Sequence, residues 1–164
     1  RELFEIREKK FQGHKKDFLT VGGMGHASQI ALGISLFKKN RMVFCIDGDG
    51  ALLMHMGALT INANNAGGNF NHIVINNSAH DSVGGQPTVG DKVDITGLAM
   101  SSGYLWAKKV TTKEKLITLI NQMRNFKGPA LLEVQVKKGF RKDLGRPTIS
   151  PLDNKYSFME FLEK

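Results

Sequence analysis

The 164 residues contain a single cysteine, Cys45, so a disulfide framework is excluded and a reducing compartment is favoured. No run of about 18 apolar residues occurs, which argues against a membrane-spanning helix. The charged opening, residues 1–4, lacks the apolar stretch of a secretory signal peptide. We therefore expect a cytoplasmic protein without a membrane partner, in which Cys45 lies in the core.

Acidic residues are scarce beside basic ones, since 15 Asp and Glu stand against 23 Lys and Arg and give a net charge of +8. The lysines occur in scattered pairs, and neither a nucleic-acid-binding motif nor a basic stripe interleaved with aromatics is present. Nucleic acid is therefore not an expected partner. A basic surface also attracts small anions, and we expect diphosphate, carboxylate or phosphonate groups.

Two apolar runs, residues 42–46 and 70–75, indicate buried parallel strands, with room between them for a crossover helix. A length of 164 residues, 41% hydrophobic residues and 18 glycines suit one globular α/β domain. The other expected elements are helices at 3–10, 27–37, 51–66, 94–102, 113–126 and 153–162, and strands at 17–21, 105–110 and 130–136.

Polar residues follow both apolar runs. Gly-Asp-Gly at residues 48–50 and the Asn76-Asn77 pair would both fall at the carboxyl edge of the sheet, where ligands bind in open α/β folds. Asp49 is a hard anionic ligand and Asn77 offers a neutral amide oxygen, a set that suits Mg²⁺ shared with phosphates. A helix beginning near Ala51 would point N–H groups at a diphosphate. Alone, however, Gly-Asp-Gly is more often an ordinary strand-turn-helix with a surface aspartate.

The spacing of Gly-Asp-Gly, 25 residues and Asn-Asn resembles the signature of the thiamine diphosphate-dependent enzymes. This resemblance implies a three-layer fold, with a mainly parallel sheet and helices on both faces. It implies Mg²⁺ held by Asp49, Asn77 and the carbonyl of Ala79. The cofactor-binding positions that it implies are Gly22, Gly23, Met24, Gly48, Asp49, Gly50, Ala51, Asn77 and Ala79.

Three glycines surround Met24 in residues 22–25, so something is expected to approach the backbone closely there. The resemblance implies that Met24 pushes the cofactor into a bent shape and that the Gly22 carbonyl bonds its amino group. The alternative is that Met24 only fills a gap in the core. His26 either faces the substrate or caps the helix that follows.

Residues 77–88 form a polar, glycine-rich run that composition alone would assign to a turn-rich linker. His80 beside Asp81 suggests a general acid or an orienting pair, and Gln86 a donor to a substrate. The sequence of residues 80–88, HDSVGGQPT, resembles that of the phosphonopyruvate decarboxylases, with the sulfopyruvate decarboxylases as close relatives. The resemblance implies decarboxylation of 3-phosphonopyruvate to phosphonoacetaldehyde and CO₂, with His80, Gln86 and His26 as candidate catalytic residues.

Arg141 and Arg146 follow the last expected strand, in a loop that contains glycine and proline. Two guanidinium groups there could clamp a phosphonate bidentately. The same residues are equally typical of a solvated basic linker, and both interpretations stay open.

The resemblance covers nearly the whole chain but only half of such an enzyme. Residues 1–164 resemble the domain that binds diphosphate and Mg²⁺, whereas the pyrimidine-binding domain and its activating glutamate have no counterpart here. We therefore expect a fragment of a longer polypeptide or one subunit of a homo- or hetero-oligomer, completed by a pyrimidine-binding partner. The other interpretations are a sulfopyruvate decarboxylase subunit, another thiamine enzyme, and a non-catalytic module that binds Mg-phosphate.

Overall fold

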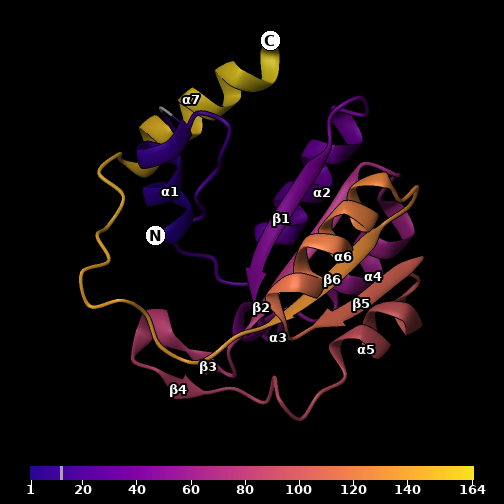
Figure 1. Ribbon diagram of the computed structural model, residues 1–164. Helices are drawn as coiled ribbons and strands as arrows, with labels where there is room; N and C mark the ends of the chain where they lie inside the picture. Colours follow the sequence, from indigo (N-terminus) through magenta and orange to yellow (C-terminus); the bar gives the residue numbers. More distant parts are fainter. Residues whose placement is uncertain (12) are drawn as a thin grey trace. The chain divides into compact units, whose positions relative to one another are not determined.

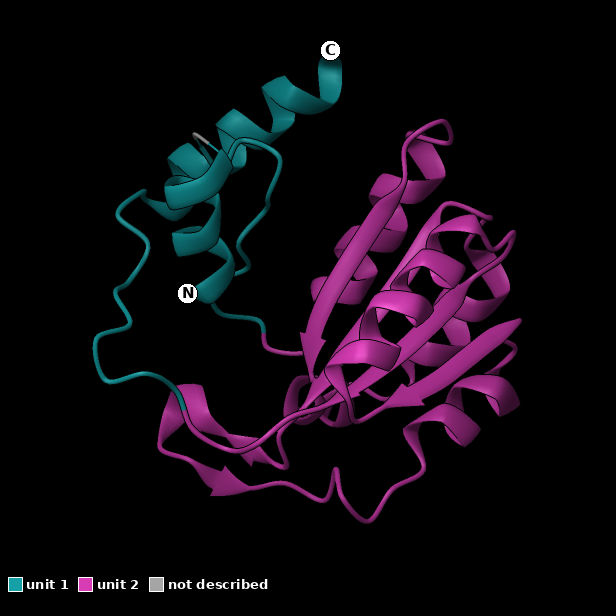
Figure 2. Ribbon diagram, in the orientation of Figure 1, with its two compact units in different colours: residues 1–23, 140–164 teal, residues 24–139 magenta. Residues whose placement is uncertain are grey.

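The computed structural model describes residues 1–11 and 13–164, which divide into two compact units (Figure 2). Unit 1 consists of residues 1–23 and 140–164, and unit 2 of residues 24–139. Unit 1 holds α1 (Glu2–Phe11) and α7 (Pro151–Glu163), which occupy the places expected for the first and last helices. Ser150 begins α7, because its side chain accepts a hydrogen bond from the N–H of Asp153.

The segment 17–21 of unit 1 is not a strand, so that prediction is wrong. The N–H of Leu19 donates to Asn154 Oδ1 at 2.8 Å, and Asn154 Nδ2 donates to the carbonyl of Asp17 at 2.9 Å. Arg7 holds the carboxylate of Asp17 with two hydrogen bonds, of 2.7 and 2.9 Å. A buried amide of α7 therefore takes the backbone groups that a neighbouring strand would have used.

Unit 2 is built on a four-stranded parallel sheet in the order β1-β2-β6-β5 (Figure 1). Parallel strands that alternate with helices confirm the expected α/β class. The elements of unit 2 are α2 (Ala27–Phe37), β1 (Val43–Gly48), α3 (Asp49–Met54), α4 (Ala58–Asn65), β2 (Phe70–Asn76), β3 (Ala79–His80), the 3₁₀ helix η1 (Asp81–Val83), β4 (Gln86–Pro87), α5 (Ile95–Ser102), β5 (Trp106–Val110), α6 (Lys113–Asn125) and β6 (Ala130–Gln135).

Helices cover both faces of the sheet, as the expected three-layer arrangement requires. One core packs residues of α2, α3, α4 and α5 against one face, and Cys45, Phe70 and Val74 belong to it. The other core packs α6 against the opposite face, through residues such as Met123 and Leu132 (Figure 1). Cys45 lies in the core as expected, and burial, followed by the charge of Asp47, raises the pKa of its thiol.

The crossover from β1 to β2 consists of two short helices instead of the single helix expected over residues 51–66. α3 ends at Met54, and the N–H of Ala58 donates to the carbonyl of His55 in a turn at 2.9 Å. Gly57 stands in this turn and lowers the propensity for one continuous helix. Among the described residues, no helix combines the length and apolar character that a bilayer span requires.

All four strands point the same way, so their carboxyl ends share one edge of the sheet. The last residues of the strands are Gly48 in β1, Asn76 in β2, Gln135 in β6 and Val110 in β5. Gly48 and Ile75 are register partners, which places the polar residues after β1 beside those after β2. The sheet topology therefore fixes where Asp49 and the asparagine pair meet.

Candidate functional site

Asp49 and Asn77 lie together at the carboxyl edge of β1 and β2, as the sequence predicts. The backbone N–H of Asn77 donates to Asp49 Oδ1 at 3.3 Å. Asp49 is the first residue of α3 and only 1% of its surface is exposed. A carboxylate so deeply buried is not the surface aspartate of an ordinary strand-turn-helix, because its charge must be met by hydrogen bonds or a cation.

The loop that follows β4 folds back onto Asp49. The hydroxyl of Thr88 donates to Asp49 Oδ2, and the N–H of Gly90 donates to Thr88 Oγ1 at 3.1 Å. The N–H of Thr88 in turn donates to the carbonyl of Ser78 at 3.0 Å. Thr88, the last residue of the HDSVGGQPT run, thus contacts the candidate metal ligand directly, a role that its sequence position did not predict.

Asn76, the first of the asparagine pair, is fully buried and builds the turn from which Asn77 projects. Its Nδ2 donates at 2.8 Å both to the carbonyl of Gly90 and to Glu133 Oε1. Its Oδ1 accepts from the N–H of Ser78 at 3.1 Å. Ser78 has a positive φ of 56°, a strained conformation for a residue with a side chain. We infer that Asn76 sustains the sharp turn that brings residue 77 to Asp49.

Glu133 supports this turn from the centre of the sheet. It lies in β6, is 0% exposed, and accepts from Lys109 Nζ of β5 at 2.9 Å as well as from Asn76. Glu133 was not among the candidate site residues predicted from the sequence. The available signal was a lone carboxylate inside an apolar run, since charged residues are almost never fully buried unless paired.

Asp81 orients Asn77 and is not the partner of His80. Asn77 Nδ2 donates to Asp81 Oδ2 at 2.8 Å, and the N–H of Gly139 donates to the same oxygen at 2.8 Å. Asn77 Oδ1 accepts from the N–H of Ala79 at 3.1 Å and keeps a second lone pair for a cation. The hypothesis of a His80–Asp81 pair is therefore replaced by an Asn77–Asp81 pair.

His80 packs directly on the Gly-Asp-Gly turn. A Cβ built on Gly50 would lie 2.5 Å from His80 Nδ1, so only glycine permits this approach. His80 and Gln86 face each other in the short antiparallel ladder of β3 and β4. Gln86 is exposed, and its side chain turns back toward Gly84, where a Cβ would lie 3.1 Å from Gln86 Nε2.

The loop of residues 22–25 spans the boundary between the two units. Gly22 and Gly23 end the first segment of unit 1, with φ of 73° and 54°, and half-buried Met24 begins unit 2. Within unit 2, Gly25 meets α3, because a Cβ there would lie 2.7 Å from the carbonyl oxygen of Ala51. The expected close approach at these glycines is therefore made by the chain itself at Gly25.

His26 occupies the N-cap position of α2, but its side chain makes no capping hydrogen bond. The ring is exposed and lies against the ring of His55, with centroids 4.2 Å apart. Helix capping through the imidazole, one of the two interpretations of His26, is thus not what the structure has.

The two arginines of the tail belong to unit 1. Arg141 is paired with Glu5 at 2.7 Å and with Asp143 at 3.7 Å. The hydrogen bonds from Lys9 and then Arg141 lower the pKa of Glu5. Arg146 is exposed. Because Arg141 already has two carboxylate partners, the solvated-linker interpretation fits this residue better than a free phosphonate clamp.

The donor set at the sheet edge suits Mg²⁺ bound together with phosphate. Asp49, Asn77 and the backbone around Ala79 offer only oxygen ligands, with a single formal charge. A Cβ built on Gly48 would meet nothing within 4 Å, so the chain leaves open space beside Asp49. The residues present therefore fit a hard cation whose remaining ligands come from water and a diphosphate.

Gly90→Ala is expected to lower metal affinity at this edge. The new Cβ would clash with Asp49 Oδ2 and lie 2.8 Å from Asn76 Oδ1. Overpacking costs about 1–3 kcal/mol, and about 1.4 kcal/mol of this falling on the metal-bound state would weaken binding about ten-fold. Mn²⁺ titration followed by electron paramagnetic resonance, with a diphosphate ligand present, measures the effect. Gly145→Ala is the control, since a Cβ there meets nothing, and equal affinities for both variants would contradict the expectation.

Known proteins resemble this chain over most of its length. Residues 6–134 match the family model "Thiamine pyrophosphate enzyme, C-terminal TPP binding domain". Phosphonopyruvate decarboxylase of Streptomyces hygroscopicus is 34% identical over 98% of this chain and 39% of that protein. Sulfopyruvate decarboxylase subunit beta of Methanocaldococcus jannaschii is 28% identical over 100% of this chain and 84% of that subunit. The chain thus spans about two fifths of the phosphonopyruvate decarboxylase.

Solved structures show the same fold. A thiamin diphosphate-dependent enzyme from Mycobacterium smegmatis aligns with a TM-score of 0.59 at 23% sequence identity. The alignment covers 72% of this chain and 23% of that one. A likeness at this identity supports the α/β architecture alone.

Proposed function

This chain belongs to the thiamine pyrophosphate enzymes as a C-terminal TPP-binding domain, and from that membership we propose that it supplies the diphosphate- and Mg²⁺-binding half of a 2-oxo acid decarboxylase. The proposed reaction converts 3-phosphonopyruvate to phosphonoacetaldehyde and CO₂. The observation that carries the proposal is the contact of buried Asp49 with half-buried Asn77 at the carboxyl edge of the sheet, where Thr88 of the following loop also reaches Asp49.

We propose that Mg²⁺ is held by Asp49, Asn77 and the carbonyl of Ala79. The support is an oxygen-only donor set in which the turn at Asn76 and the side chain of Asp81 fix the direction of Asn77. The backbone of residues 48–51 would face the diphosphate, where Gly48 leaves open space. Gly22, Gly23 and Met24 would contact the pyrimidine end of the cofactor.

When bound, thiamine diphosphate supplies the electron sink that allows CO₂ to leave the substrate. The residues of this chain bind and orient the reactants around it. His80, held over Gly50, would act as a general acid toward the substrate. Gln86 would donate a hydrogen bond to the anionic substrate from the neighbouring position of the β3–β4 ladder. His26, which is exposed and lies beside His55, is the third candidate catalytic residue.

A phosphonate is favoured over a sulfonate by charge and by the sequence identity of relatives that match nearly the whole chain. Two phosphonopyruvate decarboxylases from Streptomyces are 33–34% identical over nearly the whole chain. The net charge is +8, and Lys138 Nζ donates to the carbonyl of Gly85, which brings a cation to the loop that holds Gln86. A dianionic phosphonate benefits more from such positive charge than a sulfonate does.

The proposed enzyme needs a pyrimidine-binding half, which would be a further domain or a separate subunit. Sulfopyruvate decarboxylases named as beta subunits match the entire chain, and this supports the two-subunit arrangement. β1 also offers an apolar surface, because Phe44 and Ile46 are 40% and 50% exposed on the face opposite to the core residues Cys45 and Asp47. A partner that covered this face would remove both side chains from water.

The same beta-subunit relatives make a sulfopyruvate decarboxylase subunit the second candidate. A further beta subunit, from Methanothermobacter thermautotrophicus, is 36% identical over 63% of this chain. Turnover decides between the two candidates. The chain is joined to or mixed with its pyrimidine-binding half, with thiamine diphosphate and Mg²⁺, and given phosphonopyruvate or sulfopyruvate.

We expect turnover of phosphonopyruvate to exceed that of sulfopyruvate by about ten-fold or more, as expected for a site matched to a dianion. Turnover of sulfopyruvate alone would select the second candidate. If the complex binds thiamine diphosphate but turns over neither acid, the proposed cofactor site stands and the proposed decarboxylase activity is refuted. Equal binding of thiamine diphosphate and simple pyrophosphate would instead favour a non-catalytic Mg-phosphate module.

A further inference from the structure

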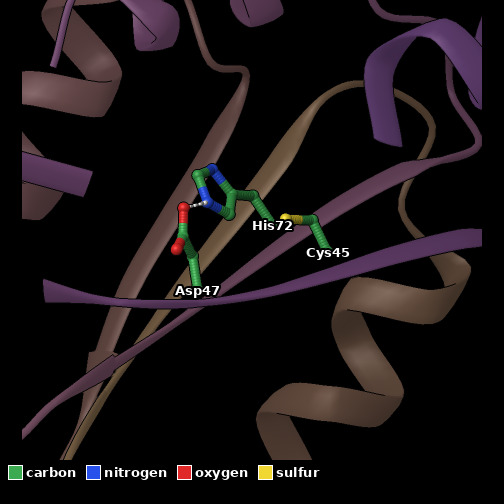
Figure 3. A group of neighbouring side chains, drawn as sticks. All are labelled: Cys45, Asp47 and His72. Carbon is green, nitrogen blue, oxygen red and sulfur yellow. Dashed lines mark ion pairs between the residues drawn. The ribbon is translucent and has the colours of Figure 1, made fainter. Parts of the chain in front are cut away.

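A second cluster of ligand-type side chains lies inside the sheet, apart from the oxygen site at its edge. Cys45 and Asp47 are two residues apart in β1, and His72 is the register partner of Cys45 in β2 (Figure 3). Side chains two residues apart point to the same face of a strand, so all three enter one core. One ligand atom from each residue lies within 4.8 Å of those of the other two.

Two atoms of this cluster are polar and buried without a hydrogen bond. Asp47 and His72 are 7% and 1% exposed, and Asp47 Oδ2 and His72 Nε2 have no hydrogen-bond partner within the described chain. They face each other at 3.8 Å, beyond the range of about 2.7–3.2 Å for a hydrogen bond. Leaving such groups unsatisfied in a dry core is destabilising, because each has lost its hydrogen bonds to water. Something more than the direct contact is needed to balance them.

We propose that Cys45, Asp47 and His72 bind a transition-metal ion of the Zn²⁺ class, independently of the Mg²⁺ site at the sheet edge. Sulfur, imidazole nitrogen and carboxylate oxygen are the three ligand types that Zn²⁺ takes in proteins. A thiolate and a carboxylate together cancel the charge of a divalent cation, so the loaded site would be electrically neutral within the core. The hard, oxygen-only set at Asp49 has the opposite preference.

The nitrogen–oxygen pair of the site requires only a small adjustment, whereas the sulfur, which lies within 4.8 Å of both other ligand atoms, must approach them to about 3.6 Å. Two bonds of about 2.1 Å at a tetrahedral angle place nitrogen and oxygen about 3.4 Å apart, so the observed 3.8 Å between Asp47 and His72 must close by about 0.4 Å. His72 is also held in the orientation that a ligand needs. Its Nδ1 shares a hydrogen bond of 3.1 Å with the hydroxyl of buried Tyr104, which leaves Nε2 facing Asp47.

Cobalt is the probe, because a Co²⁺–thiolate bond gives a charge-transfer absorption in the near ultraviolet that oxygen and nitrogen ligands do not give. The tag-free 164-residue chain is unfolded, refolded with Co²⁺ and without thiamine diphosphate, and its bound metal is measured. We expect one equivalent of Co²⁺ with the thiolate band, displaced by Zn²⁺. Since Cys45 is the only cysteine of the chain, the band has only one possible source.

Matched variants locate the ion. Cys45→Ser should lose the band, His72→Gln should weaken Co²⁺ binding by at least about ten-fold, and Asp49→Ala should keep the band unchanged. Circular dichroism checks that each variant is folded. Folded wild-type chain without the band would overturn the proposal whatever the variants do. A band that survives in Cys45→Ser, or disappears in folded Asp49→Ala, would overturn it as well.

Discussion

Asp49→Asn is expected to abolish Mg²⁺-dependent binding of thiamine diphosphate, with a loss of affinity above about a hundred-fold, since losing even the partners that orient a ligand costs about 10–100-fold. The substitution keeps the shape of the side chain but removes the only formal charge of the proposed ligand set. It also places an amide NH₂ at one of the two positions that now accept hydrogen bonds from Asn77 and Thr88. Isothermal titration with thiamine diphosphate, at several Mg²⁺ concentrations, measures the change.

Asp91→Asn is the matched control for this experiment. It makes the same chemical change at an exposed position of the loop that carries Gly90. Its binding curve should overlay that of the wild type. If Asp49→Asn retained binding with an unchanged dependence on Mg²⁺, Asp49 would be a structural carboxylate and the proposed metal site would be wrong.

Lys109→Met is expected to destabilise unit 2 and to weaken the cofactor site together. Removing one partner of a buried ion pair costs about 3–5 kcal/mol, and we expect about 2–3 kcal/mol here because Lys109 is 39% exposed to water. For a chain of this size the melting temperature should fall by about 5–10 °C. Glu133, left without its cation in the core, would also hold Asn76 less firmly.

Thermal unfolding followed by circular dichroism, paired with Mn²⁺ titration, tests this expectation. Lys108→Met removes a neighbouring exposed lysine of the same strand and should change neither quantity. Lys109→Arg keeps the cation and should restore most of the stability. A melting temperature for Lys109→Met within 1–2 °C of the wild type, by the same scaling of about 2–4 °C per kcal/mol, would show that Glu133 does not depend on Lys109.

The sequence was sufficient to predict the sheet edge because apolar strands and the residues that end them are local features. The runs at 42–46 and 70–75 became β1 and β2, and the register set Asp49 beside Asn77. The predicted α/β fold with helices on both faces is confirmed for the same reason.

Long-range hydrogen bonds explain what sequence reasoning missed. Residues 17–21 have the apolar and β-branched composition of a strand, yet Asn154, more than 130 residues later, takes their backbone groups. Glu133 and Asn76 are 57 residues apart, and no local sequence pattern predicts their hydrogen bond. His80 and Asp81 are adjacent in sequence, but Asp81 is used by Asn77 and Gly139. In the first two cases a partner far along the chain decided the outcome, whereas Asp81 has one partner nearby, Asn77, and one far along the chain, Gly139.

The strand order β1-β2-β6-β5 has a consequence for the timing of folding. β6 enters the sheet between β2 and β5, and Asn71 of β2 pairs with Ala130, 59 residues later. Such distant pairing is slow, because the entropy cost of closing the loop between the strands comes before any stabilising contact forms. Asn76 receives its buried acceptor only when Glu133 arrives with β6. On a ribosome, the turn that presents Asn77 would thus be completed only after the last strand of the sheet emerges, and a nascent chain halted before residue 130 would lack it.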